Sequence, residues 1–291
     1  MAITIIVAGK NDIACNVLKY LIKKEKEKIA FSFHEKSVLL LRDKNKILAL
    51  PNENDDGVDN WQHSFKKTAL DNDIEIINLK DAYTIENSIF LSCEFDKIIN
   101  PNLFATNKLY NIHFSKLPQY KGMYTSCLPI LFNEKESGVT LHKIDKGIDT
   151  GDIIDQITFP ISSSDVALDL YKNYTTFGFS IFVNNINNLI SGNYTSYKQP
   201  IENSSYYSLN SIDFNSKIDY RKTAQQIKNQ IHARSFIHFQ LPEFENEKII
   251  RAEIINCKST GKAGKIVEET EDYIIINSID YNVKLYKFIT K

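Results

Sequence analysis

The feature that most limits how this chain can fold is the alternation of apolar runs and helical patterns in its first half. The run from Ile3 to Gly9 is rich in β-branched residues and ends at a glycine, which predicts a buried parallel strand and a turn. Residues 11–24 then place apolar side chains at helical spacing, with Asn11 or Asp12 available as the helix cap. The lone glycine is not a G-x-G-x-x-G fingerprint, so dinucleotide binding of that kind has no support.

Further apolar runs continue this alternation. They predict strands at residues 37–43, 46–51, 74–79, 87–93 and 109–115. An acidic segment at 52–60 is typical of a surface loop, and residues 61–73 have a helical pattern. Strands that alternate with helices predict an α/β fold with a Rossmann-like, doubly wound sheet. Such sheets bind ligands at the carboxyl ends of their strands, near the point where strand order reverses.

The second half of the chain predicts a smaller domain after the sheet. Its first patterns are a strand at 138–145, an amphipathic helix at 165–192 and a Tyr-, Ser- and Asn-rich linker at 193–211. A helical pattern at 220–235 and two or three strands in the tail follow. We therefore expect a catalytic domain over residues 1–203 and a small C-terminal α+β domain over residues 204–291.

Charge and cysteine content exclude several classes of function. With 35 basic and 36 acidic residues, the chain has no general attraction to nucleic acids or anionic membranes. Cys15, Cys93, Cys127 and Cys257 lie far apart, which argues against a disulfide framework or a metal site and fits a reducing compartment. The first residues lack the pattern of a signal peptide, and no apolar run approaches the roughly 18 residues of a membrane span. We expect a cytoplasmic protein.

Two loops carry the residues on which the functional interpretation depends. The stretch NIHFSKLPQYKG sets Asn111 two residues before His113, and GIDTGDII places Asp149 between two glycines. A carboxylate beside an imidazole raises its basicity and fixes its orientation, and an amide N–H binds an oxygen that gains charge in a transition state. These groups suit direct transfer of an acyl group to an amine, without a serine or cysteine nucleophile. Taken alone, N-x-H is also a common structural hydrogen-bonding pair.

In these motifs the chain resembles the formyltransferases that use N10-formyltetrahydrofolate. Their shared pattern, N-x-H followed by a D-T-G or D-G-G turn, stands here as Asn111, His113 and Asp149-Thr150-Gly151 with the family's spacing. HFSKLPQYKGMYTS departs from the HxSLLPxxRGxxP of the enzymes that act on initiator methionyl-tRNA. The segments LPNENDDGVDNWQHSF and IFLSCEFDKII look instead like those of enzymes that formylate dTDP-linked 4-amino-4,6-dideoxyglucose, dTDP-Qui4N.

The resemblance implies a role for each motif residue. His113 would be the general base or relay the amine proton, Asp149 would orient it and favour its charged form, and Asn111 would donate to the formyl oxygen. The resemblance implies no metal. N10-formyltetrahydrofolate would lie against the strand-end backbone and the loop before Asp149, at Phe90, Leu91, Ser92, Ile144 and Asp145.

A second group of residues would hold the nucleotide sugar. The candidates are Lys10, Asn11, Tyr120, Lys121, Tyr220 and Arg234. Each also has an ordinary interpretation: Lys10 is typical of a solvated charge, Tyr220 of a packing residue, and Arg234 of an ion-pair partner. We expect no chemical role for His142, which lies on an alternating strand pattern.

The implied reaction is formyl transfer from N10-formyltetrahydrofolate to the amino group of a dTDP-linked 4-amino-4,6-dideoxyhexose, for a surface polysaccharide such as O-antigen. A homodimer built through the C-terminal part is expected, with no nucleic-acid or membrane partner. Methionyl-tRNA formyltransferase would need a basic face, because phosphate neutralisation supplies much of the affinity for RNA. A formyltetrahydrofolate hydrolase would be expected to carry a module before the first strand, and a non-catalytic folate or nucleotide-sugar binder is the third alternative. The sequence leaves three features of the substrate open: the sugar epimer, whether the nucleotide is dTDP or UDP, and whether the amino group is at position 3 or 4.

Overall fold

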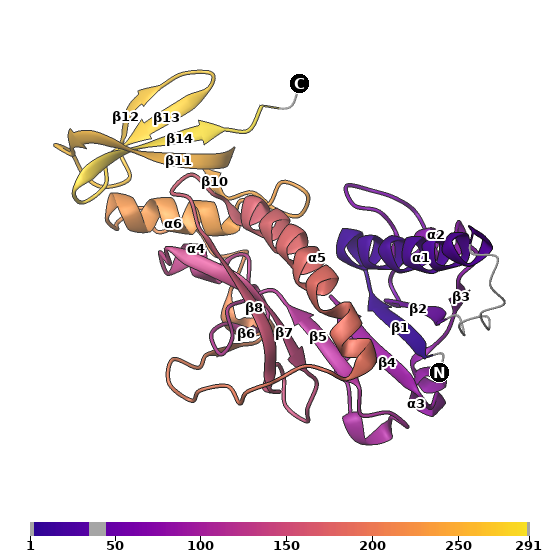
Figure 1. Ribbon diagram of the computed structural model, residues 1–291. Helices are drawn as coiled ribbons and strands as arrows, with labels where there is room; N and C mark the ends of the chain where they lie inside the picture. The colour runs from indigo at the N-terminus through magenta and orange to yellow at the C-terminus, as the bar shows by residue number, and fades with distance from the viewer. Residues whose placement is uncertain (1–2, 35–44, 290–291) are drawn as a thin grey trace. The chain divides into compact units, whose positions relative to one another are not determined.

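The computed structural model describes residues 3–34 and 45–289 (Figure 1), and the described chain falls into two compact units. The first unit comprises Met1–Lys121, Gly138–Ile157 and Tyr174–Ser204. The second comprises Gly122–Ser137, Thr158–Asn173 and Ser205–Lys291. The expected domain boundary between residues 203 and 204 stays a prediction, and the second compact unit also takes in two earlier segments.

The first unit is built on a sheet in which the described strands follow the order β3-β2-β1-β4-β5-β7-β8 (Figure 1). The strands are β1 (Thr4–Gly9), β2 (Lys46–Pro51), β3 (Glu75–Ile76), β4 (Ser88–Cys93), β5 (Leu109–His113), β7 (Glu136–Lys143) and β8 (Ile153–Pro160). β1 to β5 pair in parallel, and β7 runs antiparallel to β5. Strand order reverses at β1, which has β2 on one side and β4 on the other, as in a doubly wound sheet. The expected α/β class is confirmed.

Helices cover both faces of this sheet. They are α1 (Asn11–His34), α2 (Phe65–Leu70), α3 (Leu79–Thr84), the short η1 (Pro101–Leu103) and α5 (Ala167–Ser191). On one face, Gly178 of α5 lies so close to the sheet that an added Cβ would stand 3.2 Å from Ile13 of α1 and 3.4 Å from Ile112 of β5. On the other face, Phe90 and Leu109 form an apolar cluster with Ala82 of α3.

Side-chain caps explain why two of the expected elements are longer than the observed ones. The helix expected at 61–73 begins only after Ser64, whose side chain accepts a hydrogen bond from the backbone N–H of Lys67. The strand expected at 74–79 is reduced to β3, because Asn78 forms a capping box and α3 begins at Leu79. The strand expected at 37–43 lies outside the described residues.

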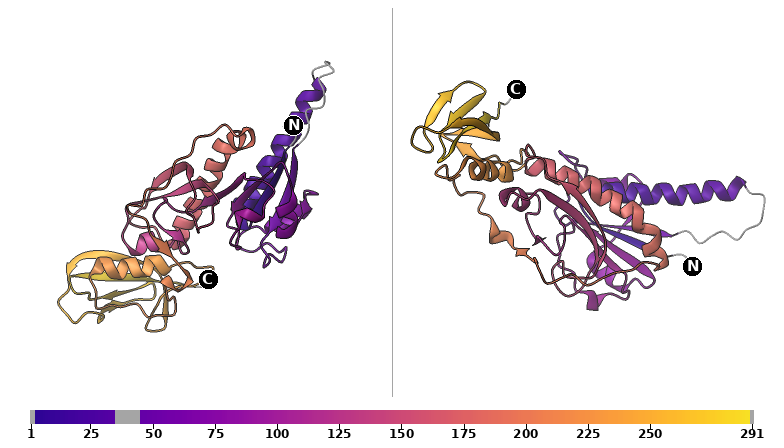
Figure 2. Two further views of the ribbon diagram at one scale, coloured as in Figure 1. Left: turned by 90° about the horizontal axis from the view of Figure 1, so that it is seen from below. Right: turned by 60° about the vertical axis from the view of Figure 1, so that its left-hand side comes forward.

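The second unit carries an antiparallel sheet whose described strands follow the order β10-β11-β14-β13-β12. They are β10 (Glu243–Phe244), β11 (Glu247–Lys258), β12 (Ile266–Glu269), β13 (Tyr273–Ile276) and β14 (Tyr281–Lys287). The helix α6 (Ala224–Arg234) lies across one face of it (Figure 2), where Ile227 and Ile231 join Ile249 and Leu285 in a buried core. Shorter elements complete the unit: β6 (Lys121–Gly122), α4 (Leu128–Leu131), β9 (Tyr206–Tyr207) and η2 (Leu209–Ser211).

Two polar contacts fix α6 within the second unit. The Asp280 carboxylate accepts the backbone N–H of Ala224, the first residue of α6, at 2.7 Å. Near the other end, His232 has Nδ1 2.9 Å from the Asp165 carbonyl oxygen, and its Nε2 accepts the N–H of Ala252 at 3.1 Å. Burial lowers the pKa of His232 to about 4, against the effect of its backbone hydrogen bonds. Across residues 3–34 and 45–289, no helix is long and apolar enough to cross a membrane.

Candidate active site

The antiparallel pairing of β5 and β7 builds a row of polar side chains on two interior strands of the sheet. Alternate residues of a strand face the same side, so Asn111 and His113 project together from β5. Asn111 is the register partner of His142 on β7, and His113 is the partner of Thr140. Both faces of β7 are buried over most of its length. The row is therefore largely enclosed by protein.

The turn after β7 brings Asp149 to this row. At Gly151 an added Cβ would lie 1.9 Å from the Lys143 carbonyl oxygen, so only glycine permits the turn to fold back onto the end of β7. Asp149 itself has φ 54°, a left-handed conformation that aspartate tolerates better than most residues. This local backbone directs the carboxylate toward β5.

The three side chains that the sequence motifs singled out converge. Asn111 Nδ2 donates to Asp149 Oδ1 at 3.1 Å, and His113 Nδ1 lies 3.5 Å from Asp149 Oδ2. Their spatial convergence was the central structural expectation from the motifs. Their chemical roles stay predictions.

The hydrogen bonds of His113 define its tautomer. Nε2 lies 2.8 Å from the carbonyl oxygen of Tyr120, and because a carbonyl only accepts, Nε2 carries the hydrogen. In the neutral ring Nδ1 is then unprotonated and faces Asp149. Burial lowers the pKa of His113, and the Asp149 charge opposes this effect. A neutral imidazole with a bare nitrogen beside a carboxylate is suited to take up a proton.

His142, for which we expected no chemical role, lies within the cluster. Its Nε2 is 3.1 Å from Asn111 Nδ2 and 3.5 Å from Asp149 Oδ1, and its Nδ1 is 2.7 Å from the Lys143 carbonyl oxygen. The expectation considered the pattern along one strand and missed the residue opposite Asn111. An antiparallel register for the two strands would have indicated it.

The same contacts bear on Asn111. Its two Nδ2 hydrogens are directed at Asp149 and His142. For Asn111 to donate to a formyl oxygen, as the resemblance implies, that oxygen must replace one of these two acceptors.

Gln199 is a second residue that the sequence did not indicate. It belongs to the segment expected to be a linker, yet its Nε2 donates to the backbone oxygens of Asp149 at 2.8 Å and Gly151 at 2.9 Å. Its buried Oε1 has no hydrogen-bond partner within the described part of the chain. The segment is held beside β8 by a bridge between Tyr197 and Ile153. Gln199 therefore ties down the turn that carries the carboxylate.

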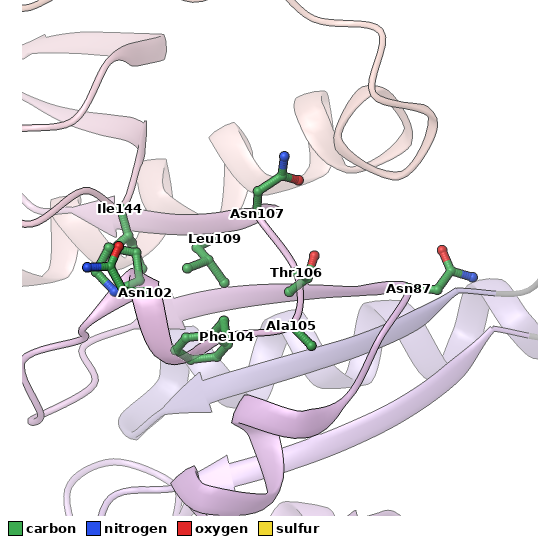
Figure 3. Close-up of a pocket in the computed structure, with 9 residues that line it drawn as sticks. Asn87, Asn102, Phe104, Ala105, Thr106, Asn107, Leu109 and Ile144 are labelled. Atoms are coloured by element: carbon green, nitrogen blue, oxygen red, sulfur yellow. The ribbon is translucent and has the colours of Figure 1, made fainter.

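The first unit has a pocket of about 630 Å³ (Figure 3). Two of its lining residues, Leu109 and Ile144, are joined by a hydrogen bond of 2.8 Å from the Ile144 N–H to the Leu109 oxygen, and they lie two residues along from Asn111 and His142. Figure 3 shows Phe104 and Leu109 facing each other across the hollow, with Asn102 and Ile144 at one end and Asn87 at the other. The wall consists of Asn87, Pro101, Asn102, Phe104, Ala105, Thr106, Asn107, Leu109 and Ile144.

One of the five predicted folate contacts lines this pocket. Ile144 lines it, whereas Phe90 and Leu91 are core residues of β4, and Ser92 is buried in the same strand. Asp145 Oδ1 accepts the Gly147 N–H at 3.0 Å and the Thr150 hydroxyl at 2.6 Å, so it shapes the turn. For all five residues, Ile144 included, folate contact stays a prediction. The pocket residues of 101–107 follow β4 and carry no motif that could have revealed them.

Four of the predicted nucleotide-sugar contacts belong to the first unit. Lys10 and Asn11 form the turn after β1, where Asn11 Nδ2 donates to Glu94 Oε2 at 3.3 Å. Tyr120 is buried, and its carbonyl is engaged by His113. Lys121 Nζ donates to Ser204 Oγ at 2.9 Å. Substrate contact by these residues stays a prediction.

The other two belong to the second unit, where each has a structural partner. The Tyr220 hydroxyl donates to the Glu243 carbonyl oxygen at 2.9 Å, and Arg234 donates to the carbonyl oxygen of Ser216 at 2.5 Å and to its hydroxyl at 2.8 Å. These contacts are of the ordinary structural kind. The proposed nucleotide role of both residues stays a prediction.

Cys127, the cysteine nearest to the motifs in the sequence, is not activated as a nucleophile. Burial raises the pKa of Cys127 to about 11, so this thiol is protonated and a poor nucleophile at neutral pH. Among residues 3–34 and 45–289, no three His, Cys, Asp or Glu side chains are grouped to hold a metal ion.

Comparison with known proteins gives a consistent result. Residues 1–186 match the sequence model of the family described as formyl transferase. WlaRD, a sugar 3N-formyl transferase solved with dTDP and 5-N-formyl-THF, is 45% identical, covers 100% of both chains and superposes with a TM-score of 0.87. The N-formyltransferase from Helicobacter canadensis, solved with folinic acid and dTDP-3-aminofucose, is 42% identical over 98% of this chain and 100% of that chain, with a TM-score of 0.86. Methionyl-tRNA formyltransferase of Coxiella burnetii is 27% identical over 224 residues, 72% of this chain and 71% of the relative.

Proposed function

The chain belongs to the formyl transferase family, and we propose that it moves a formyl group from N10-formyltetrahydrofolate to the amino group of a dTDP-linked amino-deoxyhexose. The observation that carries the proposal is the convergence of Asn111, His113 and Asp149. The full-length likeness to two sugar N-formyltransferases supports the class of acceptor.

We place the acceptor amine at C3 of the hexose. The motif resemblance implied a 4-amino sugar and left the 3-amino position open. Both full-length neighbours point to C3, because one is described as a 3N-formyl transferase and the other was solved with dTDP-3-aminofucose. The proposal therefore departs here from the first expectation.

The pocket is suited to the pterin of the formyl donor. A pterin is a flat ring with several hydrogen-bond donors and acceptors at its edge. Phe104 and Ile144 offer apolar surface to its faces, and the amides of Asn102 and Asn107, in a largely polar wall, offer hydrogen-bonding groups to its edge. Leu109 and Ile144 lie two residues along β5 and β7 from Asn111 and His142, so we expect a donor bound here to extend its formyl group toward the cluster.

The geometry suggests how the transfer proceeds. The amine nitrogen bonds to the formyl carbon, and His113 Nδ1 takes the proton that the amine loses. Asp149, 3.5 Å away, stabilises the imidazolium that forms. The bond from the formyl carbon to N10 then breaks, and His113 returns the proton to N10. An N–H of Asn111 stabilises the oxyanion once the formyl oxygen has displaced one of its present acceptors.

The activity can be tested with N10-formyltetrahydrofolate and a panel of acceptors. The panel contains dTDP-3-amino and dTDP-4-amino hexoses, their UDP counterparts, methionyl-tRNA and no acceptor. We expect tetrahydrofolate release and a formylated product, identified by its mass, with the dTDP-3-amino sugar. Equal release without any amine would establish a hydrolase, and transfer to methionyl-tRNA alone would establish the tRNA enzyme. Transfer only to the 4-amino sugar would show that the acceptor amine is at C4 and that the C3 assignment is wrong.

We infer further that the product serves a surface polysaccharide such as O-antigen, and that the enzyme acts in the cytoplasm as a homodimer. Nucleotide sugars are activated building blocks for glycans, so a formylated one has such a destination. Dimerisation through the C-terminal part can be measured by light scattering of the intact chain and of a variant altered on the second unit's exposed strands. A monomer at micromolar concentration would contradict it.

A further inference from the structure

The ring of His142 can adopt a single neutral tautomer in this site. Nδ1 lies 2.7 Å from the Lys143 carbonyl oxygen, which can only accept, so Nδ1 carries the hydrogen. Nε2 is then an acceptor, and the group that it meets at 3.1 Å is Nδ2 of Asn111. His142 is 2% exposed and is held in register opposite Asn111, so the ring has little freedom to turn.

This tautomer decides which way the Asn111 amide points. With Nδ2 inward, its two hydrogens meet the His142 lone pair and Asp149 Oδ1, each at 3.1 Å. With the amide reversed, its oxygen would face a carboxylate and a bare imidazole nitrogen, and none of the three could donate. The Asp149 carboxylate alone can accept an N–H of Asn111 from several directions. His142 Nε2 is a second acceptor, and together the two acceptors fix one orientation of the Asn111 amide.

We propose that His142 is a positioning residue that fixes the side-chain amide of Asn111, so that its N–H groups, and not its oxygen, face Asp149 and the reacting oxygen that displaces one of their present acceptors. The kinetic consequence rests on the function proposed above, but the structural claim does not. His142 belongs to none of the motif positions, and its contribution passes through Asn111.

The first test observes the amide directly. In the 15N-labelled protein, the Asn111 NH2 group is assigned by its disappearance in Asn111→Ala. We expect both hydrogens to exchange slowly and to resonate away from the positions of a solvated asparagine amide, because each hydrogen has its own acceptor. His142→Leu should speed the exchange of one hydrogen and move its resonance toward the solvated position, and His142→Gln should retain the wild-type pattern because the glutamine oxygen can reach the position of Nε2. An unchanged Asn111 signal in folded His142→Leu overturns the proposal, whether or not the chain has formyltransferase activity.

The second test is a double-mutant cycle on turnover with the acceptor found above. We expect His142→Leu to lower kcat about tenfold, the scale of one hydrogen bond lost, with KM values changed less than about threefold. His142→Gln should recover most of that loss. In the Asn111→Ala background, His142→Leu should cost less than about twofold, because the group through which it acts is gone.

The controls separate positioning from general damage. Thermal unfolding of each variant shows whether the fold is intact, and His238→Leu removes an exposed histidine of the second unit. If His142→Leu lowers kcat equally in both backgrounds, it acts independently of Asn111 and the proposal is wrong. If wild-type protein shows no formyl transfer while the resonance pattern is as expected, the proposed function fails and the positioning role stands.

Discussion

Two buried histidines, His113 in the first unit and His232 in the second, show how similar surroundings lead to different roles. Each has a ring nitrogen at a backbone carbonyl, at 2.8 Å from Tyr120 and 2.9 Å from Asp165 respectively. Burial lowers the pKa of both. The second nitrogen of His232 already receives the Ala252 N–H, whereas that of His113 faces the Asp149 carboxylate at 3.5 Å. A lone pair that the backbone does not occupy, beside a charge that can stabilise the proton, distinguishes the proposed base His113 from the structural anchor His232.

The largest expected effect removes that base. His113→Ala should lower kcat about a thousandfold, within the range of general acid–base groups, and Asp149→Ala at least about a hundredfold. Thermal unfolding of each variant shows whether the loss of turnover comes from unfolding. Steady-state turnover on the acceptor panel measures the loss. Wild-type rates in both variants would remove the assignment of His113 and Asp149.

The stability of the protein should depend on pH through its buried histidines, among them His232, whose pKa is lowered to about 4. Burial also lowers the pKa of His113, so this residue adds a loss in the same direction. His232 has a pKa of about 4 when folded and its ordinary value of 6.5 when unfolded, so the unfolded chain binds more protons between these values. Stability is therefore full above pH 6.5 and falls as the pH drops toward 4, by about 3 kcal/mol from this group. Urea unfolding from pH 7 to 4 measures it. His232→Gln should flatten that part of the curve, and an equal slope in this variant would assign the loss to other groups.

Loosening the turn that carries the carboxylate should have a moderate effect. Gln199→Leu removes both hydrogen bonds to the backbone of Asp149 and Gly151, and we expect kcat to fall about tenfold with unchanged KM values. Gln199→Glu should be worse, because it turns a carboxylate toward two carbonyl oxygens. Gln225→Leu on α6 is the matched control and should keep full turnover.

The smallest expected effect concerns the start of α6. Burial would raise the pKa of Asp280, but hydrogen bonds from Ala224, Ser278 and Tyr281 outweigh it and lower the pKa. Its stabilisation is present above the unfolded pKa and is lost as the pH falls through the lower, folded one. Asp280→Ala should cost about 1 kcal/mol, the usual size of a lost helix cap, without changing kcat. A loss of turnover would link this helix end to catalysis.

The sequence could predict what depends on local pattern. The β-branched run of β1, the long helices and the Asn111, His113 and Asp149 motifs are contiguous signals, and the expected fold class and family are confirmed. These features could be predicted without knowing which distant segments of the chain pair.

What the sequence missed depends on pairing between segments. His142 acquires its contact from the antiparallel register of β7 on β5, and Gln199 acquires its contacts because a polar segment returns beside β8. The pocket wall combines residues before β4, after it, at the start of β5 and after β7. A sequence pattern cannot predict these contacts, because each contact depends on which distant segments pair in the fold.

The contact between His113 and Tyr120 has a consequence for how position 120 tolerates change. The tautomer is set by a main-chain oxygen, which Tyr120 presents through its left-handed φ of 57°. Glycine or asparagine adopts that backbone readily, while a β-branched residue resists it. Mutational tolerance at this site should thus follow backbone preference more than aromaticity: Tyr120→Asn should keep the imidazole hydrogen in place, and Tyr120→Val should release it although the ring nitrogen itself is untouched.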